Sequence, residues 1–201
     1  MSLIPPPLQS ALVWVAWCCL HSLLISTGWT MRLRALLGRR FAWYRISYAV
    51  FSLLTLTLLV IWHFSLKQDI LFSWHGWWRL PQAGLLVYAG FMAQVGWRRY
   101  DLRYFLGISQ VADYYAGREM GAPVFAADDR GGVRHPWYSG GIALVWAAGP
   151  LTDVSLATKL VVSAYLIIGA CLEEKKLLAQ FGSDYAEYRR RLPMFIPCRR
   201  R

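Results

Sequence analysis

The chain has 201 residues, of which 57% are hydrophobic and only 16% are charged, and its formal net charge is +11. An ordinary soluble domain has about 45–50% apolar and about 25% charged residues, so this composition excludes most soluble classes. The basic residues lie between long apolar stretches, which favours loops at a membrane surface over a nucleic-acid site. The composition therefore predicts an all-α integral membrane protein with no nucleic-acid partner.

Three apolar stretches are predicted to cross the membrane as helices, at residues 8–26, 46–66 and 82–97. A crossing helix needs about 20 apolar residues, and the third stretch is somewhat short for this. No Lys or Arg precedes Arg32, which argues against a cleaved signal peptide. Residues 98–137 then form a predicted cytoplasmic loop.

Residues 138–181 are predicted to form a helical hairpin, followed by a cytoplasmic tail at 182–201. Its first arm, Tyr138 to Gly149, would rise only about 18 Å as a helix, which is too little to span a bilayer alone. Irregular backbone at membrane depth is tolerated only inside the protein or along a cavity. We therefore expect about five transmembrane helices, with the hairpin and the tail forming the functional site.

The distribution of Lys and Arg predicts the orientation of the chain. All Lys and Arg residues except Lys67, Arg79 and Lys159 lie in segments that can face the cytoplasm together. These three are left for the outer side, and Lys159 is expected to reach the interface from a helix end. The positive-inside rule then places the N-terminus outside and the C-terminus in the cytoplasm, in a bacterial inner membrane. Membrane lipids are accordingly predicted partners.

The sequence lacks several motifs that would indicate other chemistry. There is no G-x-G-x-x-G, no P-loop and no H-E-x-x-H, so the dinucleotide, phosphate-loop and zincin classes lack their defining residues. The four histidines show no metal-ligand spacing, and no C-x-x-C is present. The sequence thus predicts no metal site.

The residues before the hairpin combine basic side chains with a helix start. Pro136 suits the first position of a helix, and a helix N-terminus flanked by Arg134 and His135 is a ready site for an anion. A capped helix end, with Arg134 reaching a lipid phosphate, explains the same residues equally well. Both interpretations stay open from these residues alone.

Two further segments carry groups that suit a cation. Glu173 and Glu174 follow the second arm and fit an ammonium or sulfonium group, although a solvated helix end with Glu–Lys pairs is the simpler interpretation. Beyond the helix-breaking Gly182, Tyr185 and Tyr188 lie on one helix face, suited to a cationic cofactor or to plain packing. Together these groups match the carboxylate, ammonium, sulfonium and adenine of S-adenosylmethionine.

A family resemblance strengthens this hypothesis. The last third of the chain resembles the isoprenylcysteine carboxyl methyltransferase superfamily of membrane methyltransferases, through Arg134-His135-Pro136-x-Tyr138, Glu173-Glu174, Phe181-Gly182-x-x-Tyr185-x-x-Tyr188 and Pro193-x-x-Ile196-Pro197. The upstream half looks like the bacterial branch that contains methanethiol S-methyltransferase and NnrU-type proteins, through His21-Ser22, Tyr48 to Trp62, and Asp101 through Phe105-x-Gly107-x-x-Gln110.

The resemblance implies a methyltransferase that uses S-adenosyl-L-methionine and releases S-adenosyl-L-homocysteine. It implies cofactor contacts from Arg134, His135, Pro136, Tyr138, Glu173, Glu174, Tyr185, Tyr188 and Arg189. His135 and Asp101 are catalytic candidates, because a thiol acceptor needs deprotonation, and Gln110 and His21 are substrate-side candidates. The expected acceptor is small or lipophilic, a thiol or a prenylcysteine carboxylate. The alternatives are methylation of a phospholipid amine headgroup and a non-catalytic, NnrU-like accessory role.

Overall fold

The computed structural model describes residues 4–118 and 132–198. The chain divides into two compact units, one made of Met1–Lys67 with Tyr100–Pro123, the other of Gln68–Arg99 with Val124–Arg201. Each unit is described by itself below.

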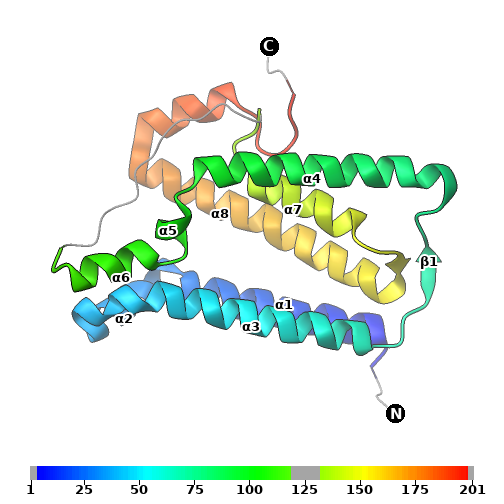
Figure 1. Cartoon of the computed structure of the whole chain (residues 1–201), viewed down its shortest axis with the longest axis horizontal. Helices are drawn as coiled ribbons and strands as arrows, with labels where there is room; N and C mark the ends of the chain where they lie inside the picture. The colour runs from blue at the N-terminus through cyan, green and yellow to red at the C-terminus, as the bar shows by residue number, and fades with distance from the viewer. Residues whose placement is uncertain (1–3, 119–131, 199–201) are drawn as a thin grey trace. The chain divides into compact units, whose positions relative to one another are not determined.

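The first unit is built on the paired helices α1 and α3 (Figure 1). Its elements are α1 (Pro6–Ile25), α2 (Thr27–Leu37), the 3-10 helix η1 (Gly38–Trp43), α3 (Tyr44–Ser65), α5 (Leu102–Phe105) and α6 (Ile108–Tyr115). Trp17 Nε1 on α1 donates to Thr55 Oγ1 on α3 at 3.0 Å, and the Tyr48 hydroxyl lies 2.8 Å from His21 Nε2. Such interhelical hydrogen bonds help helices to associate where lipid removes the hydrophobic driving force.

In the second unit, α7 packs between α4 and α8 (Figure 1). Its elements are β1 (Ile70–Phe72), the 3-10 helix η2 (Gly76–Trp78), α4 (Arg79–Arg99), α7 (Pro136–Ala147), β2 (Leu151–Thr152) and α8 (Asp153–Arg191). The antiparallel pair β1–β2 places Ile70 opposite Thr152. Thr152 then starts α8 with a capping box, because its Oγ1 accepts from Ser155 N at 2.9 Å while Ser155 Oγ accepts from Thr152 N at 2.7 Å.

Glycines allow α4 and α7 to approach closely. A Cβ added at Gly140 of α7 would lie 2.8 Å from Met92 Cβ, and one added at Gly96 of α4 would lie 2.1 Å from the Trp137 ring. Small residues at such contacts are typical of helices that pack within membranes. The first hairpin arm is therefore a regular helix, fixed against α4 along its length.

Gly182 interrupts α8, as the sequence predicts. Its φ of +53° lies in the left-handed region that glycine adopts readily, and the helix changes direction there (Figure 1). The last turns of α8 and the residues after it then lie against the start of α7. The kink thus brings the tail back to the segment that precedes the hairpin.

The membrane character of the chain is clear from its helices. Among the described residues, three helical stretches are long and apolar enough to cross a membrane, namely Pro6–Ile25, Thr27–Ser65 and Asp153–Arg191. Large apolar side chains such as Leu53, Leu58 and Ile61 are more than 60% exposed on α3, as expected of a surface that faces lipid. The predicted total of five spans and the predicted orientation stay predictions.

The expectation for Lys159 is wrong. Its side chain does not extend to an interface, because the residue is only 4% exposed and Nζ donates to Trp146 O at 3.1 Å and to Ala148 O at 2.9 Å. These carbonyls belong to the last turn of α7 and the residue after it, where they lack helical partners. Lys159 therefore closes the C-terminal end of α7.

Candidate functional site

The three residues before α7 are all buried within the second unit. Val133 is 0%, Arg134 7% and His135 2% exposed. Their backbone is fixed by the returning tail, since Arg134 N donates to Pro193 O at 2.9 Å and His135 N donates to Met194 O at 3.2 Å. Pro136 follows as the first residue of α7, as its fixed φ predicts. The helix start is thus covered by tail carbonyls.

Arg134 is held entirely by protein groups. Its Nε and Nη2 lie 2.6 Å and 2.5 Å from Glu174 Oε1. Its Nη1 donates to Arg189 O at 2.9 Å and to Leu192 O. The guanidinium therefore joins α8, the segment beyond its kink and the start of α7.

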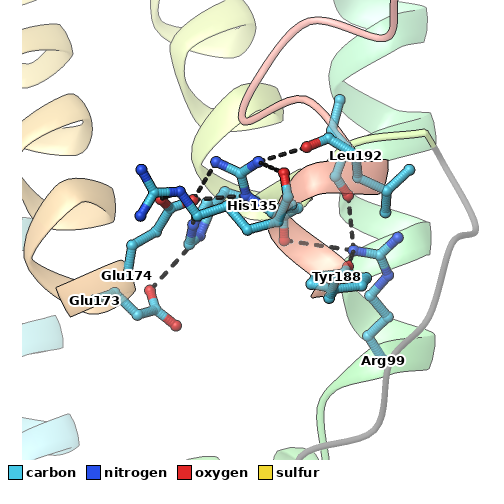
Figure 2. A network of polar contacts seen from close by, with 9 residues as sticks. Arg99, His135, Glu173, Glu174, Tyr188 and Leu192 are labelled. Carbon is cyan, nitrogen blue, oxygen red and sulfur yellow. Dashed lines mark hydrogen bonds and ion pairs between the residues drawn. The ribbon is translucent and has the colours of Figure 1, made fainter. Parts of the chain in front are cut away.

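Glu174 is the buried centre of this network (Figure 2). Besides Arg134, its Oε1 lies 3.3 Å from His135 Nε2, and its Oε2 lies 3.6 Å from Arg189 Nε. A buried carboxylate is tolerated when it is paired and hydrogen-bonded in this way. Glu174 is thus not the solvated helix end that the simpler interpretation of the sequence would require.

His135 presents one unsatisfied nitrogen. Burial lowers the pKa of its imidazole, against the raising effect of Glu173 and Glu174, so the ring is neutral at pH 7. We assign the proton to Nε2, which can then donate to Glu174, and this leaves the Nδ1 lone pair as an acceptor. Nδ1 is buried and has no hydrogen-bond partner among residues 4–118 and 132–198.

Glu173, the residue before Glu174 on α8, faces Nδ1 of His135 (Figure 2). Its Oε2 lies 3.9 Å from His135 Nδ1, and its side chain is 32% exposed, whereas that of Glu174 is 9% exposed. Two acceptors so placed, one neutral and one anionic, suit a positively charged hydrogen-bond donor between or beside them. The two adjacent acids thus differ. Glu174 is buried and paired with Arg134, whereas Glu173 is partly exposed and can accept a hydrogen bond from a ligand.

The predicted aromatic residues belong to the same cluster. Tyr185 and Tyr188 are 1% and 5% exposed, and their ring centroids lie 6.0 Å apart. The Tyr138 ring meets the His135 ring edge-on, with centroids 5.5 Å apart. The structure therefore brings all nine predicted cofactor-contact residues into one region of the second unit.

Sequence reasoning missed three residues that support this region. Arg99 Nη1, at the end of α4, donates to Val133 O at 2.9 Å and to the Tyr188 hydroxyl at 3.3 Å (Figure 2). Tyr88 and Ser139 both donate to Phe195 O, at 3.0 Å and 2.6 Å. Arg99 could have been noticed only as one of two arginines that end an apolar helix, and nothing local marks the other two.

The remaining predicted residues, Asp101, Gln110 and His21, belong to the first unit. Asp101 is the N-cap of α5, with Oδ1 accepting from Arg103 N at 2.9 Å and from Tyr104 N at 3.1 Å. Gln110 Nε2 donates to Tyr104 O at 3.1 Å, and His21 pairs with Tyr48. Each thus has a structural role, and their catalytic and substrate roles stay predictions. No group of three or more His, Cys, Asp or Glu that could hold a metal occurs in the described part of the chain.

Comparison with known proteins gives consistent matches. Methanethiol S-methyltransferase 1 of Bradyrhizobium diazoefficiens is 30% identical over 164 residues, which are 78% of this chain and 55% of that protein. Methanethiol S-methyltransferase of a Pseudomonas species, strain GM41(2012), is 30% identical over 127 residues, which are 63% of this chain and 44% of the relative. That of Pseudomonas deceptionensis is 39% identical over 69 residues, covering 34% and 26% of the two chains.

The aligned regions span about half, or less, of the length of these relatives. No family model matches the chain, and no solved structure matches it. All of these relatives are nevertheless named methanethiol S-methyltransferase, which confirms the bacterial branch that the upstream residues of the sequence predict. The chain is therefore similar to the bacterial methanethiol S-methyltransferases, the branch to which its sequence pointed.

Proposed function

We propose that this chain is an integral-membrane methyltransferase that uses S-adenosylmethionine, with its site on the cytoplasmic side of a bacterial inner membrane and its N-terminus outside. The observation that carries the proposal is the pair of open acceptors, His135 Nδ1 and Glu173 Oε2, 3.9 Å apart beside a buried ionic network. The similarity to methanethiol S-methyltransferases supports the same activity.

The residues present fit the cofactor. Its ammonium group offers three N–H donors and a positive charge, which matches the His135 lone pair and the Glu173 carboxylate. Glu174 is already neutralised by Arg134, so we assign the cofactor contact to Glu173 and a positioning role to Glu174. Arg189, whose side chain is 51% exposed, is the proposed partner of the cofactor carboxylate.

The other predicted residues shape the site. Tyr138, Tyr185 and Tyr188 supply aromatic surface suited to a sulfonium or to adenine. Pro136 fixes the start of α7, and Arg134 holds the loop before it to α8. When bound, the cofactor supplies an electrophilic methyl group on a positively charged sulfur. The protein's main contribution is then to hold the acceptor in line with that methyl group.

We propose a thiol as the acceptor, because the matching relatives are named for methanethiol. A thiol must lose a proton to become a good nucleophile. A neutral His135 can take this proton only through Nδ1, so in that role it leaves the cofactor ammonium to Glu173 alone. Asp101 stays the second candidate that the sequence predicts for this role. A prenylcysteine carboxylate would need no such base.

Calorimetric titration of the full chain in detergent with S-adenosylmethionine and S-adenosylhomocysteine tests the proposal. We expect micromolar binding of both. Glu173→Gln should weaken it about tenfold or more, since a hydrogen bond to a charged group contributes about 1.5–3 kcal/mol. The matched control is Glu187→Gln, an exposed acid on the same helix, which should leave binding unchanged.

Labelled methyl transfer to methanethiol, to a prenylcysteine and to an amine phospholipid then identifies the acceptor. Transfer to the amine lipid alone would replace our proposal with phospholipid methylation. A folded, lipid-supplemented protein that binds neither cofactor form would favour the accessory role instead. Unchanged binding in both Glu173→Gln and His135→Ala would refute the assigned site.

A further inference from the structure

A second candidate site lies in the first unit, and none of the residues that line it belongs to the cluster described above. It is a cavity of about 590 Å³, within the range of about 300–1,000 Å³ that is typical of ligand sites. It is open to one side, and the end of α2, η1 and the end of α6 line it, chiefly through Arg34, Gly38, Arg39, Ala42, Tyr114 and Arg118. The proposed methyl transfer gives this cavity no role.

The cavity is strongly basic. Arg118 pairs with Asp113, with Nη2 and Oδ1 2.9 Å apart. Arg34 and Arg39 form no ion pair with any residue of 4–118 or 132–198. Three guanidinium groups around one cavity, with a single carboxylate among them, leave an excess of positive charge. An anion in the cavity would offset that excess.

Two of the three arginines are held by contacts with α6, Arg118 by Asp113 and Arg39 by Tyr114. Arg39 Nη2 donates to Tyr114 O at 3.2 Å, and its guanidinium lies 5.5 Å from the centre of the Tyr114 ring. Gly38 ends α2 with a φ of +53°, a turn that glycine adopts readily. This turn lets Arg34 of α2 and Arg39 of η1 line the same cavity. Guanidinium groups gathered around one cavity in this way match the oxygens of a phosphate group.

The surroundings of the cavity indicate that the phosphate belongs to a lipid. The cavity adjoins the start of α3, within an apolar stretch long enough to cross a membrane. Leu36 and Leu37, beside it on α2, are 81% and 42% exposed. Trp43 and Tyr115 pack edge-on with ring centroids 6.1 Å apart, and both are exposed. Exposed aromatic residues next to arginines are typical of the membrane–water interface.

We propose that this cavity binds the headgroup phosphate of an anionic phospholipid. Arg34, Arg39 and Arg118 contact the phosphate oxygens, while the apolar surface of Leu36 and Leu37 lies against the acyl chains. The proposal is independent of the methyltransferase function, and its test uses no activity measurement.

Native mass spectrometry of the full chain in detergent, titrated with phosphatidylglycerol or with phosphatidylcholine, measures the binding. We expect clear preference for phosphatidylglycerol. The double variant Arg34→Gln/Arg39→Gln should weaken it about 30-fold, because each basic residue near anionic lipid contributes about 1 kcal/mol. The matched control Arg32→Gln/Arg40→Gln removes the same charge from positions of the same elements that do not line the cavity, and it should weaken binding much less.

A second variant, Arg118→Gln, tests the opposite wall of the cavity, with an expected loss of about fivefold. Equal losses in the double variant and its control would mean diffuse surface attraction and would overturn the site. Binding of inorganic phosphate as tight as that of phosphatidylglycerol, or no preference between the two lipids, would overturn the lipid assignment.

Discussion

Arg134 Nε and Glu174 Oε1 lie 2.6 Å apart, and this contact joins the residue two positions before α7 to the middle of α8. Both side chains are less than a tenth exposed. The two charges therefore depend on each other, since neither can be solvated without opening the contact between the tail and the hairpin.

Removing one partner of the Arg134–Glu174 ion pair should lower the free energy of unfolding. Arg134→Met would leave Glu174 buried without its closest ion-pair partner, and breaking a buried pair in this way costs about 3–5 kcal/mol. Unfolding in mixed micelles, followed by circular dichroism, measures this loss. The control Arg189→Met removes a half-exposed partner at 3.6 Å and should cost less than about 1 kcal/mol. Similar losses in the two variants would contradict the assigned centre of the network.

Gly140 should tolerate no side chain. Gly140→Ala places a Cβ 2.8 Å from Met92 Cβ, close to the backbone of α4, so the helices must move apart at a cost of about 1–3 kcal/mol. The same change at Gly90 of α4 meets nothing within 4 Å and should be neutral or slightly stabilising. Thermal unfolding of both variants tests this, and equal melting temperatures would show that α4 and α7 do not approach so closely.

The stability of the protein should depend on the protonation of His135. Burial holds its pKa below the ordinary value of 6.5, so the unfolded chain takes up this proton first as the pH falls. Stability is therefore fully present above pH 6.5 and is lost as the pH falls towards the lower pKa of the folded state. Melting temperatures at pH 8 and pH 5.5 should differ less in His135→Gln than in the unchanged protein. Parallel changes in the two proteins would show that His135 is not buried as a neutral ring.

Lys159 should stabilise the C-terminal end of α7. Lys159→Met leaves the carbonyls of Trp146 and Ala148 without their donor, which costs about 1–3 kcal/mol for buried polar groups. Lys176→Met, on the exposed face of α8, is the matched control and should have little effect. An equal, small effect of both substitutions on the free energy of unfolding would mean that Lys159 does not close the helix.

Local signals in the sequence were sufficient for much of the fold. Pro136 predicts the start of α7, Gly182 predicts the break in α8, and the spacing of Tyr185 and Tyr188 predicts their shared face. Each of these depends on the backbone preferences of one residue or on helical periodicity. Such features need no knowledge of distant parts of the chain.

The sequence alone could not predict which residues pair with distant segments of the chain. The roles of Arg99, Tyr88 and Lys159 depend on carbonyl groups of other segments, and any residue type presents a carbonyl. The same limit applies to the adjacent acids, because only the position of Arg134 distinguishes the engaged Glu174 from the open Glu173. Identical residues one position apart on a helix point in different directions, and tertiary packing decides which of them is buried.

The return of the tail onto the start of α7 also sets an order of assembly. Arg134 and His135 leave the ribosome well before Pro193 and Met194, whose carbonyls accept their backbone N–H groups. During synthesis the segment before α7 is therefore made before the groups that cover it exist. The network can close only after the last turns of α8 have been made and have turned at Gly182, so the packing of this region is completed late.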